Sequence, residues 1–195
     1  MNKLQGFYAL EKSNLPSVPW RRYDPSVQLN PEILWTIRCA VMAGDDLNLP
    51  RRIGVDSIEA KSFADALYDS LTPGDLIIYY PYFIAIKSGV LDISRQRIAI
   101  EAVKDDLWNL VTYHKKDVTI LFEEDDLRLI GNTTFLTQEE IFQLIDYCSG
   151  IKGQFQEEIR MGKNVMLEWS YAYQSNRKKE PVGKAGLIFY EIRTV

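Results

Sequence analysis

Apolar residues recur along this chain with two different periods, and each period predicts a different kind of element. Short apolar runs separated by turn residues occupy residues 75–130, a pattern typical of strands that meander through one sheet. The predicted strands fall at 75–80, 84–93, 97–103, 118–122 and 128–130, after an earlier buried strand at 33–41. Residues 42–54 are predicted to form a loop, and residues 104–113 have helical spacing.

Two longer helices are predicted from their first turns. Asp56 is followed three residues later by Glu59, a spacing that lets side chains cap the first backbone N–H groups of a helix. Thr137 and Glu140 have the same spacing. Apolar residues at helical spacing follow both signals. We therefore expect helices at 56–71 and 138–160, the second broken near Gly150 or Gly153.

The C-terminal end predicts an antiparallel hairpin, with strands at 164–173 and 186–193 and a long polar loop between them. Strand side chains alternate between the two faces of a sheet, so Leu167 and Trp169 share one face while Glu168 lies on the other. The same alternation places Glu191 and Arg193 together. The hairpin thus carries charged side chains within strands that are otherwise apolar.

These elements predict an α+β fold, with a mainly antiparallel sheet built after residue 75 and backed by the helices at 56–71 and 138–160. A parallel sheet is not expected, because strands and helices do not alternate regularly. The length of 195 residues suits one domain, placed at 33–195. Prolines mark residues 1–32, which we expect to be irregular apart from a short helix near 7–12, and to drape over the domain through Trp20 and Tyr23.

Composition and charge exclude several classes of function. The chain is 46% apolar and 26% charged with a net charge of −4, and its basic residues are scattered, so we expect no nucleic-acid partner. The acidic run at 123–126 is interpreted as a solvated turn. No apolar run reaches the roughly 18 residues of a membrane helix and no signal peptide is visible, which predicts a cytoplasmic protein without a membrane partner.

Cysteine and histidine chemistry is also disfavoured. Cys39 and Cys148 fit neither a metal-binding spacing nor a disulfide framework, so both are predicted to be core residues. His114 is the single histidine. This count excludes a cage of histidine ligands and leaves little room for a Ser-His-Asp or Cys-His site.

The most informative chemistry lies in the hairpin. Carboxylates embedded in apolar strands need a partner, because a buried unpaired charge is costly. Glu168 and Glu191 on neighbouring strands, with Arg193 two residues further on, suit a Mg²⁺ ion bound to a phosphate chain. The alternative is that Arg193 pairs with one of the glutamates and that no metal is involved.

Several short motifs, taken in order over residues 33–195, resemble the ATP-grasp-type ATP-binding domain of phosphoenolpyruvate synthase and pyruvate phosphate dikinase. The I-R-C-A run at 37–40, continued to Gly54, is similar to the family's R-S-S-A and S-F-A-G. Residues 77–83 and the S-G-V at 88–90 resemble its hinge strand, and the I-E-A at 100–102 its I-E-A. The remaining matches are the L-T helix at 136–155, the L-E-W at 167–169 and the Y-E-I-R at 190–193.

The resemblance implies a role for individual residues. It assigns Glu168 and Glu191 to Mg²⁺, and Arg38 and Arg193 to the phosphates of ATP as catalytic residues. Around the adenine and the rest of the nucleotide it places a further set, namely Tyr80, Tyr82, Phe83 and Glu101. For Arg38 the alternative is a structural salt bridge with Glu101 or Asp46.

The chain also departs from the family's pattern. Glu191 replaces a glutamine, Cys39 and Ala40 replace two serines, and the D-D-L-W at 105–108 stands where the family has G-L-G-E. A glycine-rich subdomain with a phosphate-binding lysine should precede Arg38 by more residues than are present, and Phe7 stands where that lysine would follow Gly6.

We therefore expect an ATP- and Mg²⁺-binding component of a dikinase-like phosphotransferase. It would be inactive alone and would require a partner subunit that supplies the missing lid or the phosphohistidine domain. Two alternatives stay open. One is a non-catalytic ATP-grasp relative that serves as an interaction or regulatory module, and the other is an unrelated α+β domain.

Overall fold

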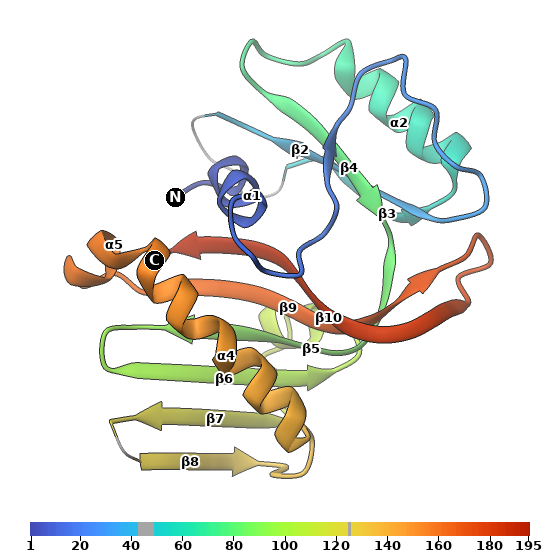
Figure 1. Ribbon diagram of the computed structural model, residues 1–195. Coiled ribbons are helices and arrows are strands. Elements are labelled where there is room, and N and C mark those ends of the chain that lie inside the picture. The colour runs from blue at the N-terminus through green and yellow to red at the C-terminus, as the bar shows by residue number, and fades with distance from the viewer. Residues whose placement is uncertain (43–48, 125) are drawn as a thin grey trace.

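The computed structural model describes residues 1–42, 49–124 and 126–195, and it confirms the α+β class. In these ranges the chain forms two antiparallel sheets and five helices (Figure 1). The sheets have the strand orders β1-β4-β2-β3 and β10-β9-β5-β6-β7-β8. No helix in these ranges is both long and apolar enough to cross a membrane.

The four-stranded sheet contains the strand expected near 33–41 and packs against one helix. Its strands are β1 (Arg21–Arg22), β2 (Trp35–Ala40), β3 (Arg51–Val55) and β4 (Leu76–Pro81). α2 (Ser57–Tyr68) covers one face, where its buried Ala60 and Ala64 pack against Ile37 and Ile77. Asp56 caps this helix as predicted, since its side chain accepts hydrogen bonds from the backbone N–H groups of Ile58 and Glu59.

The six-stranded sheet holds the larger core. Its strands are β5 (Phe83–Ile93), β6 (Arg97–Lys104), β7 (Val118–Glu123), β8 (Asp126–Gly131), β9 (Val165–Ser175) and β10 (Pro181–Thr194). α4 (Gln138–Gln154) crosses one face of this sheet (Figure 1), and its buried Leu144, Cys148 and Ile151 join the core there. The predicted capping box of Thr137 and Glu140 is present.

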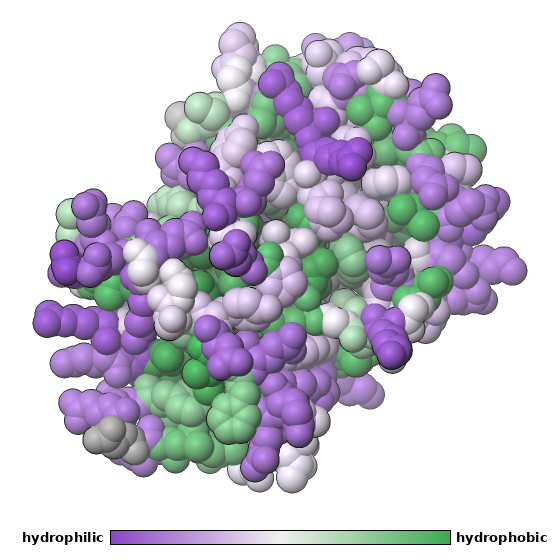
Figure 2. Space-filling view, in the orientation of Figure 1, coloured by the Kyte–Doolittle hydropathy of each residue, from purple (hydrophilic) through white to green (hydrophobic). Residues whose placement is uncertain are grey.

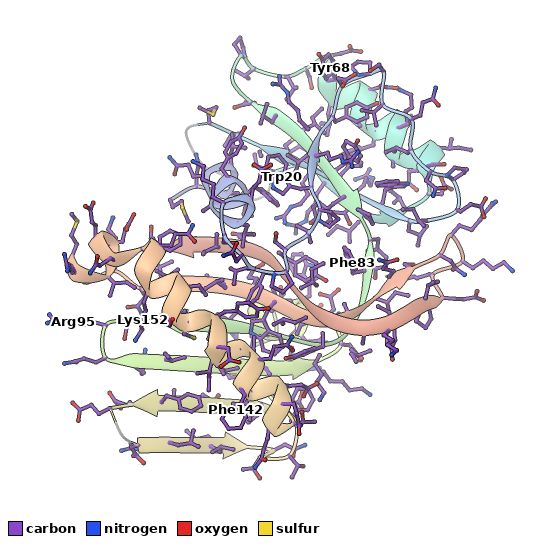
Figure 3. The ribbon with its side chains drawn as sticks, in the orientation of Figure 1. Trp20, Tyr68, Phe83, Arg95, Phe142 and Lys152 are labelled. Atoms are coloured by element: carbon purple, nitrogen blue, oxygen red, sulfur yellow. The ribbon has the colours of Figure 1, made fainter. Side chains whose placement is uncertain are left out.

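The two sheets meet on the faces that these helices leave open. Ile78 and Tyr80 of β4 pack there with Ala172 of β9 and Ile188 of β10. The chain crosses from β4 into β5 at Tyr82, and Phe83 lies at this crossover (Figure 3).

The N-terminal segment is more ordered than predicted. α1 (Lys3–Glu11) packs on β10, so closely that a side chain at Gly6 would collide with the backbone oxygen of Ile192. Ser17 forms a parallel bridge with Phe189. Tyr23 is 1% exposed in the core under α2, whereas Trp20 packs beside α1 (Figure 3). The segment does drape over the domain through these aromatic rings.

Several predicted boundaries are wrong. The single predicted sheet is two sheets, since the strand expected at 75–80 is β4 of the smaller sheet, and α2 backs that smaller sheet rather than the larger one. The predicted loop at 42–54 overlaps β3. This strand begins with two arginines, so its sequence lacks the apolar run that would indicate a strand. The expected helix at 104–113 is reduced to α3 (Trp108–Val111).

Two further corrections concern the C-terminal third. Phe155, not a glycine, separates α4 from α5 (Gln156–Arg160), because its buried ring is anchored in the core. The hairpin loop is much shorter than 174–185, since β9 continues to Ser175 and β10 begins at Pro181. The polar residues of this segment belong to the strands, and just beyond β9 Asn176 forms an antiparallel bridge with Ile33.

Apolar side chains remain exposed at the far edge of the larger sheet. Leu127 and Leu129 of β8 and Phe142 of α4 are 52%, 37% and 63% exposed. They contribute to the apolar area over β7, β8 and the near end of α4 in Figure 2, and Figure 3 shows Phe142 over β7. This edge lies away from the junction of the two sheets.

Candidate functional site

A bulge in β10 places the two glutamates on one face of the sheet. Phe189 is the register partner of Trp169, but Glu191 is the partner of Glu168, so β10 uses one more residue than β9 at this point. A one-residue shift moves a side chain to the opposite face. Without the bulge, Glu191 would point into the core beneath α4. With it, Glu168 and Glu191 lie directly opposite each other, as the hairpin pattern predicted.

Two arginines complete a charge cluster with these glutamates, and we use this name for Arg38, Glu168, Glu191 and Arg193. Arg193 Nη2 lies 2.5 Å from Glu191 Oε1 and 3.6 Å from Glu168 Oε1. Arg38 reaches the cluster from β2 of the other sheet, where its Nη2 lies 3.8 Å from Glu191 Oε2. The cluster therefore spans the junction of the two sheets.

Burial strengthens the charge–charge interactions among the four side chains of the cluster. The Glu191 side chain is 4% exposed, and those of Arg38, Glu168 and Arg193 are 15%, 19% and 27% exposed. Desolvation and the nearby Glu191 charge raise the pKa of Glu168 to about 7, against the lowering effects of Arg193, Arg38 and Lys3.

Tyr80 lies beside Arg38. Burial lowers the pKa of Arg38, but the electrostatic effects of Tyr80 and Glu191 and a hydrogen bond with Tyr80 outweigh it, so the net pKa shift is upward. Tyr80 itself is 4% exposed. Arg38 is therefore held charged and in place by one neighbour from its own sheet and one from the larger sheet.

The cluster retains unused bonding capacity. In the part of the chain that the structure describes, no group donates a hydrogen bond to the buried Glu191 Oε1, and the buried Arg193 Nε donates none. Buried polar atoms usually have partners, and an exception calls for an explanation such as a bound ion. The side chains present are two carboxylates and two guanidinium groups that can bind phosphate, and the contact of Glu191 Oε1 with Arg193 Nη2 is an ion pair without regular hydrogen-bond geometry.

This donor set fits Mg²⁺ only with help from a ligand. Across the described ranges, no group of three or more histidine, cysteine, aspartate or glutamate side chains gathers in a way that could hold a metal. Mg²⁺ is commonly bound by one or two carboxylates, with waters and substrate phosphates completing the shell. Glu168 and Glu191 can supply that pair of carboxylates.

Of the residues predicted around the adenine, the structure places Tyr80 beside the charge cluster, and Tyr82 and Phe83 at the crossover from β4 to β5. Tyr80 contacts the cluster through Arg38. The backbone N–H of Tyr82 donates to Leu34 O at 2.8 Å, and Phe83 is the register partner of Gln174, so the crossover backbone is already paired at both residues. Tyr82 and Phe83 therefore offer side chains to a base.

Glu101 does not join the charge cluster in any described contact. It lies on β6 as the register partner of Val90 and forms an ion pair with Lys116. The alternative pairing of Arg38 with Glu101 is therefore wrong. The other alternative, Asp46, lies outside the described residues.

Sequence patterns missed a polar group next to the cluster on β5, β9 and β10. Ser88 Oγ and Ser170 Oγ lie 2.7 Å apart, and Ser88 also donates to Asp105 O. Burial raises the pKa of Tyr190, while a hydrogen bond with Ser170 opposes that shift. Tyr190 is the extra residue at the bulge, and no spacing rule in the sequence marks that position.

No protein-family model matches the chain, and no curated protein matches its sequence.

Proposed function

We propose that this protein binds a Mg²⁺-nucleotide complex at the junction of its two sheets, with the charge cluster at the phosphate end. The observation that carries the proposal is a pair of facing carboxylates set between two arginines, in which Glu191 Oε1 lies 2.5 Å from Arg193 Nη2 but accepts no hydrogen bond of regular geometry from any described residue. An oxygen in that position suits a hard cation. Such a ligand favours a role in the cytoplasm, where ATP is abundant.

Each residue of the cluster has a role in this proposal. Glu168 and Glu191 would hold Mg²⁺, while Arg38 and Arg193 would bind phosphate oxygens, with Tyr80 keeping Arg38 in position. The ion, when bound, neutralises negative charge on the phosphates. The cluster draws on the I-R-C-A, L-E-W and Y-E-I-R motifs, which are far apart in the sequence, and their convergence supports the resemblance to the ATP-grasp domain.

The chain supplies only part of what phosphoryl transfer needs. The sequence has no glycine-rich phosphate loop, and His114, its single histidine, follows the short helix α3. Positioning and charge stabilisation provide nearly all of the rate in this chemistry. We therefore propose a nucleotide-binding component of a phosphoenolpyruvate synthase-like or pyruvate phosphate dikinase-like phosphotransferase that depends on a partner subunit for catalysis.

Thermal unfolding with Mg²⁺-ATP and Mg²⁺-ADP tests the proposal. A ligand at about 100 times its Kd adds about 2.7 kcal/mol to the stability of the form that binds it, so the Tm should rise. EDTA should remove the increase, and Glu168→Gln or Arg38→Gln should abolish it. Glu101→Gln, which changes a carboxylate outside the cluster, should preserve it. An unchanged wild-type Tm at millimolar Mg²⁺-ATP contradicts the proposal.

A second candidate is an interaction or regulatory module in which the cluster only joins the two sheets. The mutual pairing of Arg193 with both glutamates favours it, because each charge already has an opposite charge nearby. This candidate predicts no effect of Mg²⁺-ATP on the Tm. It also predicts that Arg38→Gln destabilises the protein to the same extent with and without nucleotide.

A further inference from the structure

A third arginine projects from the same face of the four-stranded sheet as Arg38. Arg51 of β3 is the register partner of Arg38. Directly opposite residues of an antiparallel pair share a face, with Cβ atoms ~4.5–5.5 Å apart. The next residue, Arg52, faces α2 instead, where it lies over the Phe63 ring and pairs with Glu59. Arg51 is therefore directed toward the junction of the two sheets and Arg52 away from it.

The environment of Arg51 differs from that of the two arginines in the cluster. Its guanidinium carbon lies 4.7 Å from the ring centroid of Trp108, which begins α3 after β6 of the larger sheet. Trp108 is 44% exposed. In the described ranges no carboxylate lies within ion-pairing distance of Arg51, whereas Arg38 and Arg193 both pair with Glu191. A cation–π contact at an exposed ring is a weak substitute for an anion.

We infer that Arg51 is a third anion-binding arginine of the nucleotide site, which takes a phosphate or carboxylate group beyond those held by Arg38 and Arg193. This inference rests on the proposed function. A guanidinium group binds either anion through two parallel hydrogen bonds, and its planar face can remain stacked on an aromatic ring. Trp108 keeps the Arg51 side chain positioned at the junction until the anion arrives.

Two sources of this anion share the same chemistry. One is the far end of the nucleotide's own phosphate chain, and the other is an acidic second substrate. Calorimetric titration of wild-type protein, Arg51→Gln and the matched control Arg52→Gln separates them.

If the nucleotide supplies the anion, Arg51→Gln should weaken Mg²⁺-ATP binding about tenfold or more and leave AMP binding unchanged. If a second substrate supplies it, Mg²⁺-ATP binding should be unchanged. The same variant should then weaken, about tenfold or more, the binding of orthophosphate or pyruvate to the Mg²⁺-ADP complex. Arg52→Gln should behave as wild type in every titration. Wild-type affinity of Arg51→Gln for all of these probes overturns the inference.

Trp108 provides a readout that does not require nucleotide. Binding of an anion changes the contact between Arg51 and the indole ring, so tripolyphosphate should cause a saturable change in Trp108 emission. The change should be absent in Trp108→Phe and Arg51→Gln, partly restored by Arg51→Lys, and intact in Arg52→Gln. Melting curves of each variant establish that it is folded.

This second readout separates the two ideas. If tripolyphosphate changes Trp108 emission in a wild-type protein that does not bind Mg²⁺-ATP, the nucleotide proposal is contradicted and the Arg51 anion site is supported. The absence of any response in wild-type protein that binds Mg²⁺-ATP overturns the Arg51 inference and leaves the nucleotide proposal intact.

Discussion

The two faces of the six-stranded sheet differ in chemistry where β9 and β10 pass between α4 and the smaller sheet. The face toward α4 is packed with apolar side chains such as Leu167 and Trp169, each 0% exposed. The face toward the smaller sheet carries the partly buried Glu168 and the buried Ser170 and Glu191. Replacing buried charged groups with apolar ones is often neutral or stabilising. The contrast teaches that the α4 face has the composition of a stabilising core, whereas the other face carries the charged groups that the proposed binding would use.

The largest expected effect tests the apolar face. Trp169→Ala should lower the free energy of unfolding by about 3–5 kcal/mol, because it removes a fully buried ring and leaves a cavity. Urea unfolding measures this change. Phe142→Ala is the matched control, since it removes an aromatic ring that is 63% exposed and should change stability far less. Equal effects of the two substitutions would contradict the role assigned to this face.

Removing the cation that both glutamates share should produce the next largest effect. Arg193→Met leaves two facing carboxylates without their nearest partner, which should cost roughly 2–3 kcal/mol at pH 8. This value is below the usual range for a buried pair because Arg193 is 27% exposed. The deficit in urea unfolding should shrink at pH 5, where Glu168 becomes protonated. A deficit that does not depend on pH would argue against a loss of charge pairing.

The pKa of Glu168 gives a prediction of the opposite sign. Its folded-state pKa of about 7 lies above the ordinary value of 4.5, so folding favours the protonated form. The resulting stability is fully present below about pH 4.5 and is lost as the pH rises through 7. Glu168→Gln should therefore be more stable than wild type at pH 8, by about 1–2 kcal/mol, with little gain at pH 4.5.

The same variant should lose Mg²⁺-ATP binding while it gains stability, which is the behaviour of a residue kept for function. Urea unfolding at several pH values, beside nucleotide titration, checks both parts. Parallel pH profiles for the wild type and the variant would show that Glu168 is not desolvated as described.

The smallest expected effect lies away from the cluster. Thr137→Ala removes the cap of α4 and should cost about 1 kcal/mol, with nucleotide affinity unchanged. Thermal unfolding and titration measure the two quantities. A loss of affinity in this variant would mean that the two faces are coupled through the sheet.

The sequence predicted the elements whose signals are local. Asp56 and Thr137 marked helix starts correctly, because capping depends on neighbouring residues. The Phe155 break was missed, because it depends on how that ring packs in the core. β3 was missed for a similar reason, since its pairing with β2 and the contacts of Arg51 and Arg52 with aromatic rings all involve other elements.

The site was predictable to the extent that strand alternation determines it. Glu168, Glu191 and Arg193 were singled out from the hairpin pattern, and the structure brings them together with Arg38. The bulge at Tyr190 that makes this possible, and the ion pair that removes Glu101 from the group, depend on contacts between distant strands. No local pattern encodes such contacts.

The close approach of Gly6 to the backbone of Ile192 has a consequence for the order of assembly. α1 packs on β10, so part of its docking surface is missing until a strand far along the chain is in place. The ion-pair partners of Arg38 and Glu168 lie on the same strand, because β10 carries Glu191 and Arg193. Contacts between such distant segments close large loops and slow folding. The complete charge cluster and the docked α1 therefore both depend on the placement of β10.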